Sequence, residues 1–359
     1  MVDVQLKDYK ICTTASAIAK YNINTRRLLF LHQLCNGIFL QFFEWKPQKL
    51  GDNIKLKKIL HWSQILRNQY GERVQKVALD IGAGCPNRTG LTQGGCIFCD
   101  ERGGGSGAFI KKISLSEQIR KGVEGAQKHY KTKAIILYFQ SYSATNLPIG
   151  EFAKACSEAF TIAKSLGAKV CGISVSTRPD LLPQNTLDYL CEIAEKTETW
   201  VELGVQTTDE NGLKWLRRGH DLAAVENALS RLIRTNIKVC AHLIAGIPGE
   251  AEDQLTQSAL WLAERGVDAL KFHPLHVLRG TRLEEYYQNG SFVPLSRDAY
   301  LQKVVAALIA IPDGIIIQRL NAGVRPRYLT APEWILDKER LEREIEERFS
   351  QALDSPNLL

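Results

Sequence analysis

Residues 200–206 read WVELGVQ, and apolar and polar side chains alternate along this segment. Alternation with a period of two is typical of a β-strand, whose successive side chains point to opposite faces. One face of this strand carries three branched apolar residues, whereas Glu202 and Gln206 lie on the other. Strands that helices cover on both faces are usually apolar throughout. We therefore expect helices on one face of this strand and a polar environment on the other.

Six further segments have the length and composition of short strands: residues 74–81, 134–140, 169–176, 237–245, 269–275 and 314–319. Helical patterns lie between them, at residues 116–129, 149–166, 222–235 and 251–265. Strands that alternate with helices of this length form βαβ units and a parallel sheet. Such a sheet either closes into a full or partial barrel or stays open as a doubly wound sheet.

The polar face recurs on the neighbouring strands, where it carries Tyr138, Gln140, Ser174, Ser176, His242, Lys271 and His273. On the strand at residues 169–176, we expect Cys171 on the apolar face beside Ile173 and Val175. Burying so many polar groups without partners costs free energy, whereas a lumen that holds a polar ligand satisfies them. We predict an α/β fold: a partial (β/α)6-type TIM-like barrel with a ligand-binding lumen and additions at both ends of the chain.

The barrel core is expected at residues 57–330. A C-terminal helical tail follows at residues 331–359, and its charged helix at 337–354 places opposite charges three and four positions apart, as on a solvated helix surface. Residues 1–50 form an N-terminal extension of uncertain structure. Its most apolar part, residues 28–45, is interrupted by polar residues. We interpret it as a partly buried helix, with contact to a membrane surface as the alternative and no stable membrane insertion.

The composition is that of an ordinary globular protein. Of the 359 residues, 45% are hydrophobic and 24% charged, which excludes a disordered or collagen-like chain. The 46 Lys and Arg against 39 Asp and Glu give a net charge of +7, which permits an anionic partner such as RNA without requiring one. The 9 cysteines are too sparse for a secreted disulfide scaffold, so a reducing, cytoplasmic location is expected.

Three of the cysteines fall within CPNRTGLTQGGCIFC, residues 85–99, directly after the first of these strands. The thiolates of Cys85, Cys96 and Cys99 can bind a metal or three corners of an iron–sulfur cluster. Structural zinc takes four ligands, and the distant His129 is a candidate for the fourth, so zinc is disfavoured but left open. A four-iron cluster held by three cysteines leaves one iron free for a substrate or cofactor.

Glycines flank the cysteines on both sides, and residues 103–107 read GGGSG. They let the backbone approach a bulky group closely and adopt positive φ. A phosphate-binding loop is the competing interpretation, but the chain has no GxxxxGK[ST] motif and GGGSG alone is a weak signal.

The cysteine loop resembles that of radical S-adenosylmethionine (SAM) enzymes. Their common spacing is CxxxCxxC with an aromatic residue before the last Cys; here Phe98 fits, and the first gap has ten residues. A lengthened first gap is similar to that of the Elongator catalytic subunit and its bacterial relatives. Further strings resemble one uncharacterised bacterial branch of that group: YFQSYS at 138–143, STRPD at 176–180, VELGVQT at 201–207, LRRGHD at 216–221, HLIAGIPGE at 242–250, LHVLRGTRL at 275–283 and TAPEW at 330–334. The resemblance covers roughly residues 57–350 in order.

The resemblance implies that Cys85, Cys96 and Cys99 hold a 4Fe-4S cluster whose open iron binds the amino and carboxylate groups of SAM. One electron, from a donor such as flavodoxin or ferredoxin, would then cleave SAM to methionine and a 5′-deoxyadenosyl radical. The radical would abstract hydrogen from an unknown substrate, for which the Elongator resemblance suggests RNA. The second class of function is a metal- or cluster-stabilised RNA-binding or scaffold protein without SAM chemistry.

By the same resemblance, six residues would contact SAM: Phe98, Gln140, Ser176, Gln206, Arg218 and His242. Gln206 and Arg218 match a pair that enzymes of the anaerobic coproporphyrinogen oxidase type use on SAM, and His242 stands where some relatives have an Asp. The sequence departs from the pattern where QSY at residues 140–142 replaces a glycine-rich segment and where Ser176 replaces a frequent Glu. Gln206 and His242 could instead be satisfied polar groups of the barrel interior. Substrate contacts are expected from four residues that share the polar face: Glu202, Lys271, His273 and His276.

Overall fold

The computed structural model describes residues 57–90 and 93–354. They belong to a unit that spans residues 52–359. The interpretations of residues 1–50, including the helix at 28–45, lie outside the described residues, and the domain limits at residues 57 and 330 stay a prediction. In the part of the chain that is described, no helix combines the length and the apolar character that a membrane span requires.

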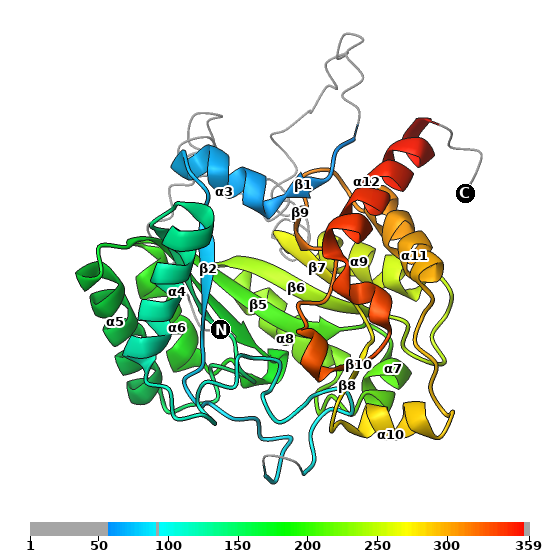
Figure 1. Ribbon diagram of the computed structural model, residues 1–359, viewed down its shortest axis with the longest axis horizontal. Coiled ribbons are helices and arrows are strands. Elements are labelled where there is room, and N and C mark those ends of the chain that lie inside the picture. The colour runs from blue at the N-terminus through cyan, green and yellow to red at the C-terminus, as the bar shows by residue number, and fades with distance from the viewer. Residues whose placement is uncertain (1–56, 91–92, 355–359) are drawn as a thin grey trace, which may run out of the picture. The chain divides into compact units, whose positions relative to one another are not determined.

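Eight parallel strands form one curled sheet, in the spatial order β1-β9-β7-β6-β5-β4-β3-β2 (Figure 1). The strands are β1 (Leu60–His61), β2 (Gln75–Leu79), β3 (Ala134–Phe139), β4 (Lys169–Thr177), β5 (Glu198–Gln206), β6 (Lys238–Ala245), β7 (Ala269–Pro274) and β9 (Ile316–Arg319). All seven predicted strands are present, and the predicted partial barrel is confirmed. The edge strands β1 and β2 are not hydrogen-bonded to each other, so the barrel is open along that side.

Most of the helices lie outside the curve of the sheet (Figure 1). They are α3 (Trp62–Tyr70), α4 (Leu115–Tyr130), α5 (Ile149–Ser165), α6 (Gln184–Ala194), α7 (Glu210–Trp215), α8 (Leu222–Leu232), α9 (Gln254–Glu264), α10 (Arg282–Gln288), α11 (Arg297–Ala310) and α12 (Lys338–Asp354). Ser114, Asp221 and Ser296 begin α4, α8 and α11, because each side chain accepts a bond from the backbone N–H three residues on. Shortly after β7, β8 (Val277–Leu278) pairs with β10 (Leu329–Ala331) in a separate antiparallel sheet.

The outer face of the sheet forms the main core, as the alternation predicted. Leu137 and Phe139 of β3 and Val201 of β5 are fully buried there among helix side chains. Phe139 meets Phe152 of α5 with the ring centroids 6.1 Å apart. Burying one side chain of this size stabilises the fold by about 1.5–3 kcal/mol. The helices are therefore held against the outer face mainly by apolar burial.

The inner face is apolar at the amino-terminal ends of the strands. Trp62 and Leu66 of α3 pack there in one cluster with Trp200, and the rings of Trp62 and Trp200 lie 5.4 Å apart. Cys171 packs in this inner cluster, so the prediction that it shares a face with Ile173 was wrong. The register between β3 and β4 shifts beside Cys171, and the extra residue of such a bulge turns its side chain to the other face. This apolar layer closes one end of the lumen.

The charged helix α12 packs on the barrel along one side. Leu341, Ile345 and Phe349 are buried in the same core as the outer face of the sheet. On the more exposed side, Arg340 and Glu344 form an ion pair four residues apart, as the charge spacing predicted.

Candidate active site at the carboxyl ends of the strands

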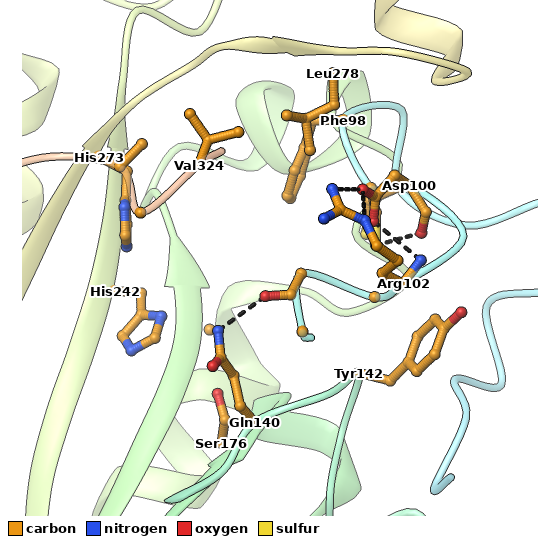
Figure 2. Close-up of a pocket in the computed structure, with 18 of the residues that line it drawn as sticks. Phe98, Asp100, Arg102, Gln140, Tyr142, Ser176, His242, His273, Leu278 and Val324 are labelled. Carbon is orange, nitrogen blue, oxygen red and sulfur yellow. Dashed lines mark hydrogen bonds and ion pairs between the residues drawn. The ribbon is translucent and has the colours of Figure 1, made fainter. Parts of the chain in front are cut away.

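A cavity of about 430 Å³ lies at the carboxyl ends of the strands. Twelve of the thirteen predicted site residues line it: Cys85, Cys96, Phe98, Cys99, Gln140, Ser176, Gln206, Arg218, His242, Lys271, His273 and His276. Figure 2 shows the ring of Phe98 across the cavity from Gln140 and Ser176, with His242 and His273 to one side. The thirteenth residue, Glu202, is fully buried and does not line the cavity. Active sites of α/β barrels lie at this end of the sheet.

Each cysteine of the loop has a guanidinium beside its thiol. The pairs are Arg178 with Cys85, 3.7 Å from Nη1 to Sγ, Arg218 with Cys96, 3.2 Å from Nη1 to Sγ, and Arg88 with Cys99. Burial and the neighbouring Cys96 raise the pKa of Cys99 to about 12, and Arg88 acts against that rise. A neighbouring cation favours the thiolate, which is the form that binds iron. The arginines therefore prepare the loop for an anionic, thiolate-held group.

The arrangement of the thiols fits an iron–sulfur cluster. Within residues 57–90 and 93–354, no three Cys, His, Asp or Glu side chains converge on a site for one metal ion. Cys85, Cys96 and Cys99 nevertheless all line one cavity. The ligands of a cubane bind separate irons around one shared space, and three of them leave one iron for another ligand.

The glycine run after the loop packs against the end of β3. The side-chain amide of Gln140 donates to the carbonyl of Gly104 at 2.8 Å, as Figure 2 shows. A Cβ at Gly103 would overlap the ring of Tyr142, and one at Gly105 would overlap the side chain of Ser141. Residues 103 and 105 are therefore glycine because residues 140–142 pack too closely against them for a side chain. At this point the bulky Gln140 and Tyr142 follow β3, and glycines face them.

Gln206 and Arg218 meet over the backbone of Gly204. The guanidinium of Arg218 donates to the Gly204 carbonyl at 2.6 Å. A Cβ at Gly204 would lie 2.9 Å from Gln206 Nε2 and 3.0 Å from Arg218 Nη2. Gln206 has φ +78°, and the register between β5 and β6 shifts beside it. Non-glycine residues held in this conformation concentrate at functional sites. The structure thus brings the predicted pair together, and its role toward SAM stays a prediction.

A cluster of polar side chains surrounds Glu202 beneath the cavity. Its carboxylate accepts bonds from Lys271 Nζ at 2.9 Å, Tyr138 Oη at 3.0 Å, Lys76 Nζ and Ser174 Oγ, and lies 2.9 Å from His242 Nε2. Lys76, on the edge strand β2, also donates to Gln318 of β9 at 3.1 Å. The contacts of Lys76 therefore link the two sides of the open barrel. We call Glu202 and the five side chains that contact it the floor cluster: Lys76, Tyr138, Ser174, His242 and Lys271.

The charges of the floor cluster follow from burial and from the two lysines. Burial alone would raise the pKa of Glu202, but the cations of Lys271 and Lys76 outweigh it and hold that pKa well below its ordinary value. Burial lowers the pKa of Lys271 to about 8 and the pKa of His242 to about 4. Burial also lowers the pKa of His273 well below its ordinary value. Near neutral pH the two histidines are thus uncharged, and Glu202 is an ion.

The sequence analysis missed six cations of the site: Lys76, Arg88, Arg102, Arg178, Arg319 and Arg325. One signal existed for Lys76, because Val77 and Leu79 occupy the opposite face of its short strand. Arg178 and Arg88 lie in loops, where no periodicity assigns a direction to a side chain. Their contacts with the cysteines depend on the tertiary fold alone.

The family model of the radical SAM superfamily matches residues 79–262, and the model of the radical SAM C-terminal domain matches residues 267–351. The chain is similar to the uncharacterized protein YtqA of Bacillus subtilis, with 35% identity over 79% of this chain and 88% of that protein. It is also similar to the tRNA uridine(34) acetyltransferase of Dehalococcoides mccartyi, with 28% identity over 53% of this chain and 41% of that protein. Elp3 of Methanocaldococcus infernus shares the fold, with a TM-score of 0.59 and 19% identity over 77% of this chain and 63% of that structure.

Proposed function

This chain belongs to the radical SAM superfamily, and on that premise we propose that it is an enzyme which cleaves SAM reductively and acts on a substrate in the lumen. One observation carries the proposal: three thiols, each beside a guanidinium, share a cavity with Gln206 at the carboxyl ends of a parallel barrel. Membership of the family implies SAM and a 4Fe-4S cluster as cofactors.

Cys85, Cys96 and Cys99 would hold the cluster. When bound, the cluster supplies one electron that cleaves SAM to methionine and a 5′-deoxyadenosyl radical, which takes a hydrogen atom from the substrate. Flavodoxin or ferredoxin is the class of protein that would deliver the electron. The guanidiniums beside the thiols stabilise the negative charge of such a group and tune it from outside the ligand set.

Arg218 and Gln206 are proposed to bind the methionine end of SAM. Arg218 is 7% exposed, and within the described residues its Nε has no hydrogen-bond partner. A buried N–H group without an acceptor costs free energy, which a carboxylate beside it would recover. Phe98 would lie by the adenine, and Gln140, Ser176 and His242 offer hydrogen bonds around the same cavity.

Lys271, His273 and His276 are proposed to contact the substrate. Burial lowers the pKa of His273 and His276, so each ring stays neutral and offers one donor and one acceptor. Glu202 is proposed as a positioning residue, because protein donors already surround its carboxylate. These groups suit a polar substrate, and we propose RNA because a relative is a tRNA uridine(34) acetyltransferase. A cytoplasmic location follows from that substrate and stays part of the proposal.

The test is anaerobic reconstitution with iron and sulfide, followed by chromatography of the products from SAM and dithionite. About four irons per chain and reductant-dependent 5′-deoxyadenosine are expected. Cys96→Ala should lose both. Cys191→Ala is the matched control, because Cys191 lies on α6 and does not line the cavity.

Zinc in place of iron, with no cleavage of SAM by the wild-type chain, would contradict the enzyme. The chain would then be a metal-stabilised RNA-binding or scaffold protein, which is the second candidate. A loss of iron and product in Cys191→Ala equal to that in Cys96→Ala would show general misfolding instead of a ligand role.

A further inference from the structure

A second hollow, of about 700 Å³, lies against the cysteine loop. It shares seven lining residues with the first cavity: Arg88, Gly95, Cys96, Cys99, Asp100, Arg102 and Tyr328. The loop is therefore the wall between the two spaces. A ligand that lies in the second hollow passes directly beside the cysteines.

Arginine dominates this second hollow. Its lining includes six arginines, Arg88, Arg102, Arg217, Arg279, Arg282 and Arg327, against three carboxylates, Asp100, Glu101 and Glu285. Six minus three leaves a local charge of +3. We call this hollow the arginine groove. Its arginines come from four separate segments, so the charge is created by the fold and not by a basic run in the sequence.

Four of the six arginines form no ion pair within residues 57–90 and 93–354. Arg217, Arg279, Arg282 and Arg327 are exposed, and none of them forms an ion pair with another residue of the described ranges. Arg102, by contrast, pairs with Asp100, and Arg340 and Arg343 on α12 pair with glutamates four residues on. Exposed like charges gathered on one surface repel one another and attract a polyanion.

We propose that the arginine groove binds the phosphodiester backbone of RNA and leads one nucleotide to the cavity behind the cysteine loop. Guanidinium groups match phosphate oxygens with two parallel hydrogen bonds, which makes arginine the preferred residue for this contact. The inference rests on the proposed function, since it supplies the path by which an RNA substrate would reach the cavity.

Tyr328 stands where the two spaces meet. It lines both of them, and the guanidinium of Arg102 lies 3.3 Å from its ring centroid. Arg327 lies 4.7 Å from the same centroid. Aromatic side chains are platforms on which unpaired bases stack without sequence preference, and arginine adds cation–π contacts. A base that stacks on Tyr328 would share the ring with the guanidinium of Arg102 or displace it. Tyr328 is thus placed to receive the base that leaves the groove.

Binding of a fluorescein-labelled tRNA transcript to the reconstituted protein, followed by anisotropy, tests the groove. Four phosphate contacts predict that the affinity falls about 50- to 150-fold between roughly 50 and 200 mM KCl. The double variant Arg279→Gln/Arg282→Gln should bind at least about tenfold more weakly at the lower salt and should lose one to two units of the salt slope. Retained cluster absorbance and an unchanged thermal unfolding midpoint would show that the variant is folded.

The matched control is Arg340→Gln/Arg343→Gln, which removes the same charge from α12, a helix with no residue in the lining of the arginine groove. Equal loss of affinity in both double variants would overturn the proposal, because binding would then depend only on net charge.

Displacement of the tRNA by polyglutamate at equal charge would also overturn the proposal, because it would indicate an acidic protein segment as the partner. Formation of 5′-deoxyadenosine without RNA reports on the proposed function alone. A wild-type chain that cleaves SAM but does not bind tRNA would therefore contradict this inference and the proposed RNA substrate, and would leave the proposed SAM cleavage standing.

Discussion

The floor cluster and the cysteine loop face the same lumen, yet only the first is complete within the chain. The carboxylate of Glu202 accepts bonds from side chains on four strands, and two lysines balance its charge. The loop instead presents three thiols and three guanidiniums around a cavity. Folding alone supplies the hydrogen-bond partners of Glu202 in the floor cluster, whereas the thiols of the loop are arranged for a group that the chain does not supply.

This difference between the floor cluster and the cysteine loop predicts how substitutions in each region change the stability of the fold. Buried ions in the floor cluster are stable only because each is paired, and losing one partner leaves a charge in a place without solvent. The loop lies against cavities and contains glycines that adopt positive φ. Substitutions should therefore affect the stability of the floor with or without iron, and those in the loop should mainly affect loading.

The largest expected effect on stability is that of Glu202→Gln. It should lower the free energy of unfolding by about 3–5 kcal/mol, because Lys271 and Lys76 lose their common counter-ion. Urea unfolding of the iron-free protein measures this loss. Glu252→Gln is the control, since Glu252 is 93% exposed in its pair with Lys303 and should change the stability by less than about 1 kcal/mol. A loss that appears only after reconstitution would break the comparison.

Gly103→Ala should have an intermediate effect and lower the free energy of unfolding by about 1–3 kcal/mol. The residue has φ +61°, and a methyl group there would overlap the ring of Tyr142. We expect fewer irons per chain after reconstitution, because the loop would move away from residues 140–142. Gly90→Ala, within the cysteine loop, would meet no atom of the described residues within 4 Å and should load iron normally. If both variants lost iron equally, the packing against β3 would not be what positions the loop.

The smallest effect concerns pH. Because burial lowers the pKa of His242 to about 4, the unfolded chain takes up a proton first as the pH falls below about 6.5. Stability is therefore lost between these two values, and one such histidine contributes about 1–2 kcal/mol of the loss from pH 7 to pH 5. In urea unfolding at both pH values, the free energy of unfolding of His242→Gln should fall by about 1–2 kcal/mol less than that of the wild type. His129→Gln, at an exposed residue of α4, should match the wild type.

The sequence predicted the strands well because each one alternates between an outer face that helices cover and an inner face that lines the lumen. It placed Gln206 and Lys271 in one lumen, since parallel strands bring their carboxyl ends together. It failed at Cys171, where a bulge between β3 and β4 reverses the alternation. It also missed the guanidiniums of Arg88 and Arg178, because loop side chains have no period.

The open side of the barrel is spanned by side chains and not by a backbone ladder. β2 and β9 are joined across it by the contact of Lys76 with Gln318, and no backbone ladder closes the sheet there. A ladder opens only when several peptide hydrogen bonds break together, whereas a lysine side chain changes its reach by rotation about single bonds. The two sides of this opening are thus held by side-chain contacts, so that a movement between them would break none of the backbone hydrogen bonds of the sheet.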